Sequence, residues 1–211
     1  MRALTWNVYH GRSPRPVGRS LLNEFAAALA GWEWDVALLQ EVPPWWPPLL
    51  ARAAGADHRV RLTSRNACLA LRRAISSRNP DILKANGGGA NAILVRGHTI
   101  HAHESERLTW RPERRYAHAV RLDAGWVVNV HSSTHREEWA RRDTLRALER
   151  WPAPYLFGGD LNLHGRPELP GLTRLGSNHV DHLYAQAPGS RKAEVLDRGE
   201  LSDHPPLRVT L

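Results

Sequence analysis

Residues 155–162, YLFGGDLN, join a short apolar run to a carboxylate and an amide through two glycines. We expect residues 155–157 to form a buried strand, after which the glycines let the backbone pass close to a neighbour. Asp160 and Asn162 then project to the same side, because residues two apart share one side of an extended segment, while Leu161 turns into the core. This stretch predicts a strand that ends in a polar site.

The same kind of ending recurs along the chain, always with Asn, Asp, Glu or His. The instances are Asn7 in LTWNV, Glu41 after VALLQ, His131 after WVVNV, Asp181 and His182 in HVDHLY, and Asp203 and His204 before PPLRVTL. Each alone has an ordinary structural explanation, such as a turn, a solvated strand end or a hydrogen-bonded core histidine. Because an unpaired polar end of a buried strand is costly, their number favours convergence of several strand ends on one pocket.

Short runs rich in Val, Ile and Leu alternate with turn signals, and few segments have helical spacing. The expected strands are 2–8, 36–39, 58–62, 67–71, 90–95, 117–122, 126–130, 155–157, 179–184 and 207–211. The expected helices are 19–30, 45–54 and 136–151. Many strands with apolar residues on both faces predict stacked sheets with helices outside them. No repeat or linker divides the chain, so we expect residues 1–211 to form one domain.

The composition is typical of a soluble globular protein in a reducing compartment. Of the 211 residues, 42% are hydrophobic and 24% are charged, and no apolar run approaches the ~20 residues that span a bilayer. The only cysteine, Cys68, excludes an internal disulfide framework. It stands in the apolar run 67–71, where an inert thiol is expected rather than a nucleophile. The N-terminus lacks a signal peptide's features, and we expect a cytoplasmic monomer.

The formal net charge is +8, with 29 Lys and Arg against 21 Asp and Glu. A basic surface attracts polyanions such as nucleic acid or phosphorylated lipid headgroups. The arginines are spread along the chain, however, and Lys84 and Lys192 are the only lysines, which is equally typical of an arginine-rich composition. Charge therefore leaves the partner open.

Carboxylates, amides and histidines without a cysteine cluster suit a hard divalent ion, Mg²⁺ or Mn²⁺, rather than structural zinc. Histidines beside such an ion suit proton transfer to and from water and a phosphate oxygen. The glycine run 87–89 is not followed by Lys and Ser or Thr, which argues against a Walker-type NTPase. No Gly-x-Ser-x-Gly elbow of a serine hydrolase occurs.

Taken in order, the motifs resemble the endonuclease/exonuclease/phosphatase superfamily. They are TWNV, LLQEV, GGGANAIL, VVNVH, GGDLN, VDHLY and SDHPPL, and they run from Thr5 to Leu207. The superfamily includes deoxyribonuclease-like enzymes, exonuclease III-like abasic endonucleases, inositol-polyphosphate 5-phosphatases and sphingomyelinases. The resemblance implies an α/β fold: a four-layer α/β/β/α sandwich of two mostly antiparallel β-sheets, packed face to face with outer helices. This agrees with the stacked sheets predicted above.

The resemblance also implies hydrolysis of a phosphoester by metal-assisted, in-line attack of water, with Mg²⁺ or Mn²⁺ as cofactor. Glu41 would be the main metal ligand, with Asn7 beside it and Asp203 completing the shell. Asp160 would position or deprotonate the attacking water. Asn162 would donate to the phosphate as charge builds on it.

The implied proton transfer and phosphate contacts involve the remaining polar strand ends. His204 would contact the scissile phosphate and transfer a proton, with Asp181 orienting its ring and favouring the imidazolium. His131 would be a second contact to the phosphate or the leaving group. In the middle of the chain, Arg115 is favoured over Tyr116 as a further phosphate contact.

The substrate class stays open at this point. A phosphodiesterase or nuclease, with endonuclease or exonuclease action on nucleic acid, is the leading interpretation. The alternatives are a phosphatase or phosphodiesterase acting on inositol phosphate or phospholipid headgroups, and a non-catalytic polyanion-binding module. The short stretch between Asn162 and Asp181 indicates that long substrate-reading insertions are missing. Trp45 and Trp46, which follow Glu41, are interpreted as a rigid helix start against the core rather than as a stacking platform.

Overall fold

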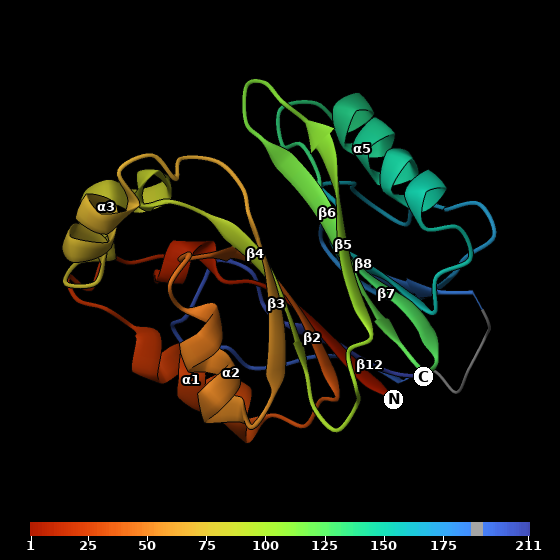
Figure 1. Ribbon diagram of the computed structural model, residues 1–211, viewed down its shortest axis with the longest axis horizontal. Helices are drawn as coiled ribbons and strands as arrows, with labels where there is room; N and C mark the ends of the chain where they lie inside the picture. The colour runs from red at the N-terminus through yellow and green to blue at the C-terminus, as the bar shows by residue number, and fades with distance from the viewer. Residues whose placement is uncertain (187–191) are drawn as a thin grey trace.

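The computed structural model describes residues 1–186 and 192–211 and consists of two six-stranded sheets with helices on their outer faces (Figure 1). The strands of the first sheet are β1 (Arg2–Asn7), β2 (Val36–Val42), β3 (Asp57–Leu62), β4 (Ala90–Val95), β11 (Lys192–Val195) and β12 (Leu207–Thr210). Those of the second are β5 (Ala102–Thr109), β6 (Arg115–Leu122), β7 (Gly125–His131), β8 (Leu156–Asp160), β9 (Thr173–Asn178) and β10 (Asp181–Ala185). The spatial orders are β11-β12-β1-β2-β4-β3 and β5-β6-β7-β8-β10-β9.

Each sheet contains one parallel pair among antiparallel neighbours. β1 pairs with β2 in parallel and β7 with β8, and the other ladders are antiparallel. A parallel connection requires a crossover, which α1 (Leu22–Gly31) supplies in the first sheet and α5 (Glu137–Arg150) in the second. The carboxyl ends of both parallel pairs are where ligands bind in open α/β sheets.

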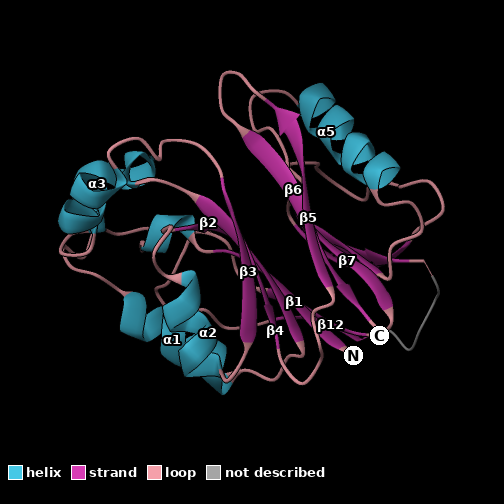
Figure 2. Ribbon diagram, viewed as in Figure 1, coloured by secondary structure: helices cyan, strands magenta, loops and turns pink. Residues whose placement is uncertain are grey.

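Three apolar layers hold these elements together. Leu4, Trp6 and Phe25 belong to the cluster between the first sheet and α1 with α2 (Pro47–Ala54). A second cluster, which includes Val127 and Leu183, fills the space between the sheets, and a third lies between the second sheet and α5. Figure 2 shows α1 and α2 outside one sheet and α5 outside the other. The predicted four-layer sandwich is therefore confirmed.

Strand alternation directs the polar strand ends into the space between the sheets. Val127 of β7, Leu156 of β8 and Leu183 of β10 point into the middle apolar layer. Because side chains two residues apart share a face, His131 and Asp160 belong to the same inner face, as does Asp181 of β10. The polar pocket is thus the continuation of the middle core at one end of the sandwich.

The strand expected over 67–71 is wrong. Cys68 is exposed, has a φ of 52° and precedes the helix α3 (Leu69–Ser76), which is followed by the short helix α4 (Pro80–Leu83). A short apolar run does not distinguish a strand from a helix by periodicity alone. The thiol is therefore not held in an apolar strand as we expected.

Three strands were not predicted: β5, β9 and β11. Their sequences, AHESERLT, TRLGSN and KAEV, are mostly polar, so they lack the apolar run on which a strand prediction depends. Two short 3₁₀ helices, η1 (Tyr9–Gly11) and η2 (Lys84–Gly87), complete the structure. No helix among the described residues is long and apolar enough to cross a bilayer.

Candidate active site

The ends of five strands from both sheets meet at one edge of the sandwich. Register places Asn7 beside Gln40 in the first sheet, and Asp160 beside both His131 and Asp181 in the second. Asn7 Nδ2 donates a hydrogen bond of 2.9 Å to Asp160 Oδ2, which links the two sheets directly. The predicted convergence of strand ends therefore occurs.

Glu41 reaches this edge through an irregularity in β2. Its neighbours Ala37 and Leu39 point toward the outer helices, so simple alternation would direct Glu41 the same way. Instead the β2–β4 register shifts between Leu39 and Val42, and Glu41 has a φ of 53°. Its Oε1 lies 3.8 Å from Nε2 of His131, a residue of the opposite sheet. A bulge of this kind re-aims a side chain, and such bulges are frequent next to active sites.

Asp160, Asp181 and His204 form the buried centre of the site, with ligand atoms within 4.8 Å of one another. His204 Nδ1 lies 2.8 Å from Asp181 Oδ2. Burial, and after it the charge of Asp181, raises the pKa of Asp160 to about 7. Burial also raises the pKa of Asp181, against the opposing effect of His204. Burial alone would lower the pKa of His204, but its hydrogen bond with Asp181 and the surrounding carboxylates raise it to about 9.

His204 is fixed from its backbone as well. Its N–H donates to Ser202 Oγ at 3.0 Å, and that hydroxyl donates to the carbonyl of Asn7 at 2.6 Å. Trp6 Nε1 donates to the carbonyl of His204 at 2.8 Å. These three bonds anchor the loop before β12 to the end of β1.

His131 and Arg115 form the second part of the site. The Arg115 Nη1 lies 2.5 Å from His131 Nε2 and 2.9 Å from Nδ1, while Arg115 Nη2 donates to Glu113 Oε2 at 2.7 Å. Burial, followed by the charge of Arg115, holds the pKa of His131 well below 6.5. Tyr116, the other candidate, is buried beneath Arg61, whose guanidinium carbon lies 4.1 Å from the centre of its ring. Arg115, not Tyr116, is therefore the side chain at the site.

Asn162 and Asp203 occupy the rim. The backbone N–H of Asn162 donates to Asp160 Oδ1 at 3.2 Å, and its side-chain Nδ2 donates to the carbonyl of Ser132 at 3.1 Å. Asp203 is exposed, and its charge acts on both Asp181 and His204. The structure thus brings Asp203 near the buried centre but gives it no contact with Glu41.

The sequence analysis missed three residues of the site: His10, Glu113 and Arg65. His10 Nε2 lies 3.2 Å from Glu41 Oε2. Its position three residues after Asn7, a predicted site residue, could have marked it as a candidate. Glu113 holds both Arg115 and Arg65, and nothing in the sequence marked this pairing. The missed residues line a pocket beside Glu41 whose walls are His10, Glu41, Thr63, Ser64, Arg65, Gly89, Glu113, Arg114, Arg115 and His131.

Trp46 has the structural role that we expected. It is 2% exposed, and its ring lies 5.5 Å from that of Phe25. A Cβ on Gly11 would collide with the Trp46 ring, so the indole packs against the backbone of the His10 loop. The tryptophan supports this loop from behind.

The donor set fits a divalent cation. Ligand atoms of Asp160, Asp181 and His204 lie within 4.8 Å of one another, and the Glu41 carboxylate, whose charge acts on Asp160, lies beside His131. Carboxylate oxygens are the ligands that hard cations prefer. Asp181 Oδ1 is buried without a hydrogen-bond partner among the described residues. A buried carboxylate oxygen in this state is costly unless a bound group satisfies it.

The ordered motifs and this geometry agree with the comparison to known proteins. Residues 4–204 match the Endonuclease/Exonuclease/phosphatase family. The chain belongs to this family. Its members' common chemistry makes it a hydrolase of phosphoester bonds, and the predicted resemblance is confirmed.

Several solved structures share the fold of this chain. An endonuclease/exonuclease/phosphatase from Beutenbergia cavernae is 18% identical with a TM-score of 0.74, covering 99% of this chain and 70% of its own. TDP2 from Caenorhabditis elegans is 16% identical with a TM-score of 0.69, covering 99% and 73%. The mannosyl-6-phosphatase Bt3783 of Bacteroides thetaiotaomicron is 13% identical with a TM-score of 0.67, covering 100% and 98%. No curated protein sequence matches this chain.

Proposed function

We propose that this family member is a divalent-metal-dependent phosphodiesterase, with nucleic acid as its leading substrate class and Mg²⁺ or Mn²⁺ as its cofactor. The observation that carries the proposal is the junction of Glu41, His131, Asp160 and the Asp181–His204 pair at one end of the two sheets. Glu41 would be the main ligand of the cation, with Asn7 and Asp203 as the further ligands that the family resemblance implies. When bound, a divalent cation polarises the phosphate and stabilises the charge that develops on it.

The chain's own residues divide the proton transfers between them. Asp160, whose pKa is raised to about 7, is suited to accept a proton from the attacking water near neutral pH. His204, whose pKa is raised to about 9, stays an imidazolium there; it contacts the phosphate and donates a proton to the leaving oxygen as the P–O bond breaks. Asp181 orients its ring. Arg115 and Asn162 donate to the phosphate oxygens, and neutral His131 contacts the same group.

A basic and aromatic surface favours a diester that continues beyond the reacting phosphate. Beside the pocket, Trp110 is 54% exposed. The guanidinium carbons of Arg107 and Arg114 lie 4.9 and 5.6 Å from the centre of its ring. Arg65 and Arg114 line both the pocket at Glu41 and the adjacent hollow at Trp110. Arginine with an exposed aromatic ring suits phosphates and stacked bases.

A phosphatase acting on a small phosphomonoester is the second candidate. It is supported by the confined pocket at Glu41, which is walled by Arg65, Glu113 and Arg115, and by the fold shared with a mannosyl-6-phosphatase. Inositol phosphates and phospholipid headgroups belong to the same class of test substrates.

The test is hydrolysis of plasmid DNA, an abasic-site duplex, bis-nitrophenyl phosphate and a phosphomonoester panel, each with Mg²⁺, Mn²⁺ or EDTA. We expect diester cleavage that EDTA abolishes and that His204→Ala lowers by about 10²-fold or more. His98→Ala removes an exposed histidine and should leave cleavage unchanged. Turnover of monoesters alone would favour the phosphatase, and cleavage that survives both EDTA and His204→Ala would refute the mechanism. Polyanion binding without hydrolysis of any substrate would indicate a binding module.

A further inference from the structure

His10 stands between two oxygen acceptors. Its Nδ1 lies 3.3 Å from the carbonyl of Gly88, and its Nε2 lies 3.2 Å from Glu41 Oε2. A neutral imidazole has one N–H, so it can donate to only one of them. With the proton on Nδ1, the N–H donates to Gly88 and the lone pair of Nε2 faces the carboxylate. In that tautomer a cation shared by Nε2 and the carboxylate would satisfy both lone pairs, whereas the other tautomer would donate from Nε2 to Glu41.

The spacing of these two atoms suits such a cation. Adjacent ligands of an octahedral ion, each at ~2.1 Å, are about 3 Å apart. The contact to Gly88 is also what ligating histidines show, since their second nitrogen almost always donates to a carbonyl or carboxylate. We propose that His10 is a metal ligand, whose Nε2 holds the divalent cation together with Glu41. This inference rests on the proposed metal-dependent function and adds a nitrogen ligand to its site.

The backbone is built to hold His10 in this place. Tyr9 and His10 have φ values of 49° and 54°, a conformation that non-glycine residues rarely adopt. Gly11 follows, where a Cβ would collide with the Trp46 ring. The His10 side chain itself is only 11% exposed. Such strain persists where the surroundings over-determine the conformation, and it collects at ligand sites.

His131 is the other histidine near Glu41, but its nitrogens are engaged. Its Nε2 is 3.8 Å from Glu41 Oε1, farther than that of His10. Arg115 lies 2.5 Å from the same nitrogen, and the positive guanidinium opposes a cation there. His10 is therefore the nitrogen ligand that the geometry favours.

An imidazole ligand changes which metal the site prefers. Mg²⁺ favours oxygen ligands and water, whereas Mn²⁺ and later transition ions accept imidazole more readily. We expect the protein to bind Mn²⁺ more tightly than Mg²⁺, and His10→Gln to reduce that preference by about tenfold or more, mainly through weaker Mn²⁺ binding.

The test measures Mn²⁺ bound to the full chain by pulsed electron paramagnetic resonance, which detects coupling to a directly bound ¹⁴N nucleus. The wild type and the control His98→Gln should show the coupling, and His10→Gln should lose it. If His10→Gln binds Mn²⁺ too weakly to load, His10→Asp supplies an oxygen ligand and should restore binding without the ¹⁴N coupling. Mn²⁺ and Mg²⁺ affinities of each variant, from calorimetric titration, give the change in preference.

The outcomes separate this inference from the proposed function. Coupling that persists in His10→Gln, or that disappears only in His131→Gln, would overturn the role of His10 while leaving the metal site intact. A pairing of protonated His10 with Glu41 would leave the Mn²⁺ preference unchanged in His10→Gln, which also overturns it. Failure of the wild type to bind Mn²⁺ or Mg²⁺ at all would instead refute the metal-dependent function, a result that Glu41→Gln cross-checks.

Discussion

Left-handed backbone conformations collect at the residues of the site. Tyr9, His10, Glu41, Asn162 and Ser202 have φ values between 49° and 55°. Each such residue costs about 1–3 kcal/mol relative to an ordinary conformation. The residue types do not predict these left-handed conformations. Strand alternation alone would direct the Glu41 side chain toward the outer helices. The sequence therefore indicated which residues meet at the candidate site, whereas the conformations that aim them depend on contacts between distant segments.

Asp181→Asn tests the pairing of Asp181 with His204. The amide still accepts a hydrogen bond from Nδ1, but the negative charge that stabilises the imidazolium is lost. We expect kcat to fall by roughly 10²- to 10⁴-fold, the usual contribution of general acid–base catalysis. Burial raises the pKa of Asp181, which means that its charged form is unfavourable in the fold. The variant should therefore keep or slightly gain thermal stability, as differential scanning calorimetry would show.

Asp123→Asn is a matched control, because the Asp123 side chain is 80% exposed and pairs only with His101 among the described residues. It should leave both kcat and the melting temperature unchanged. A parallel loss of activity and stability in Asp181→Asn would mean that the carboxylate is structural.

At the scale of elements, a buried polar layer ties the two sheets together behind the site. Asn129 of β7 donates through Nδ2 to the carbonyls of Leu39 and Ala92 in the first sheet, both at 3.0 Å. Its Oδ1 accepts from Gln40 Nε2 at 2.8 Å. Glu41 follows Gln40 in β2, and His131 is the next inward-facing residue after Asn129 in β7. This layer therefore sets the distance between the candidate-site residues of the two sheets.

The element pattern of the chain was largely predictable, and its exceptions have physical causes. The central strands β1, β2, β7 and β8 are apolar on both faces, which the sequence shows directly. The edge strand β5 alternates between exposed and half-buried positions without an apolar run, and it was missed. The contact of Glu113 with Arg65 joins segments far apart in the chain, which periodicity does not detect.

Asn129→Ala should destabilise the protein by about 2–3 kcal/mol. It leaves buried partners in both sheets without their hydrogen bonds, and each unsatisfied group costs about 1–3 kcal/mol. Urea denaturation followed by circular dichroism measures this free energy of unfolding. Asn23→Ala, at an exposed position of α1, should change it by less than about 0.5 kcal/mol. A loss as small as that of the control would show that the layer does not hold the sheets together.

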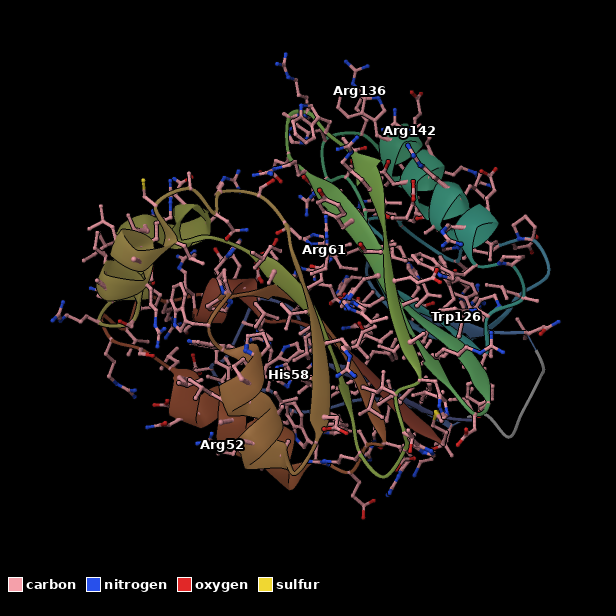
Figure 3. The ribbon with its side chains drawn as sticks, viewed as in Figure 1. Arg52, His58, Arg61, Trp126, Arg136 and Arg142 are labelled. Atoms are coloured by element: carbon pink, nitrogen blue, oxygen red, sulfur yellow. The ribbon has the colours of Figure 1, made fainter. Side chains whose placement is uncertain are left out.

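Across the whole molecule, positive charge is not confined to the site. Arg52 lies by α2, whereas Arg136 and Arg142 lie by α5 on the other side of the sandwich (Figure 3). The net charge of +8 therefore produces a positive electrostatic field around the whole molecule as well as at the site. A general field raises the rate of encounter with a polyanion, and contacts at the pocket decide its position.

The difference between the overall positive field and the contacts at the pocket predicts how ionic strength changes KM for different substrates. KM for a nucleic-acid substrate should rise steeply with ionic strength, because bound counterions are released when arginines contact several phosphates. KM for bis-nitrophenyl phosphate, which has one phosphate, should change little. Steady-state kinetics across a series of KCl concentrations compares the two. Equal salt dependence for both substrates would contradict an extended contact with the nucleic-acid backbone.

Global stability should depend on pH through His118, which is buried between the sheets. Burial, then the charges of His103 and Arg61, holds the pKa of His118 well below 6.5, so the folded protein keeps it neutral. The unfolded chain takes up this proton as the pH falls through about 6.5, which favours unfolding. The stabilising effect is therefore complete above that pH and decreases below it. Lowering the pH from about 7.5 to about 5.5 should reduce the free energy of unfolding by up to about 1.4 kcal/mol through His118.

His118→Gln keeps an acceptor for Asn129 and should remove this share of the pH dependence, as urea denaturation at both pH values would measure. An identical pH dependence in the variant and the wild type would show that His118 takes up its proton equally well in the folded state.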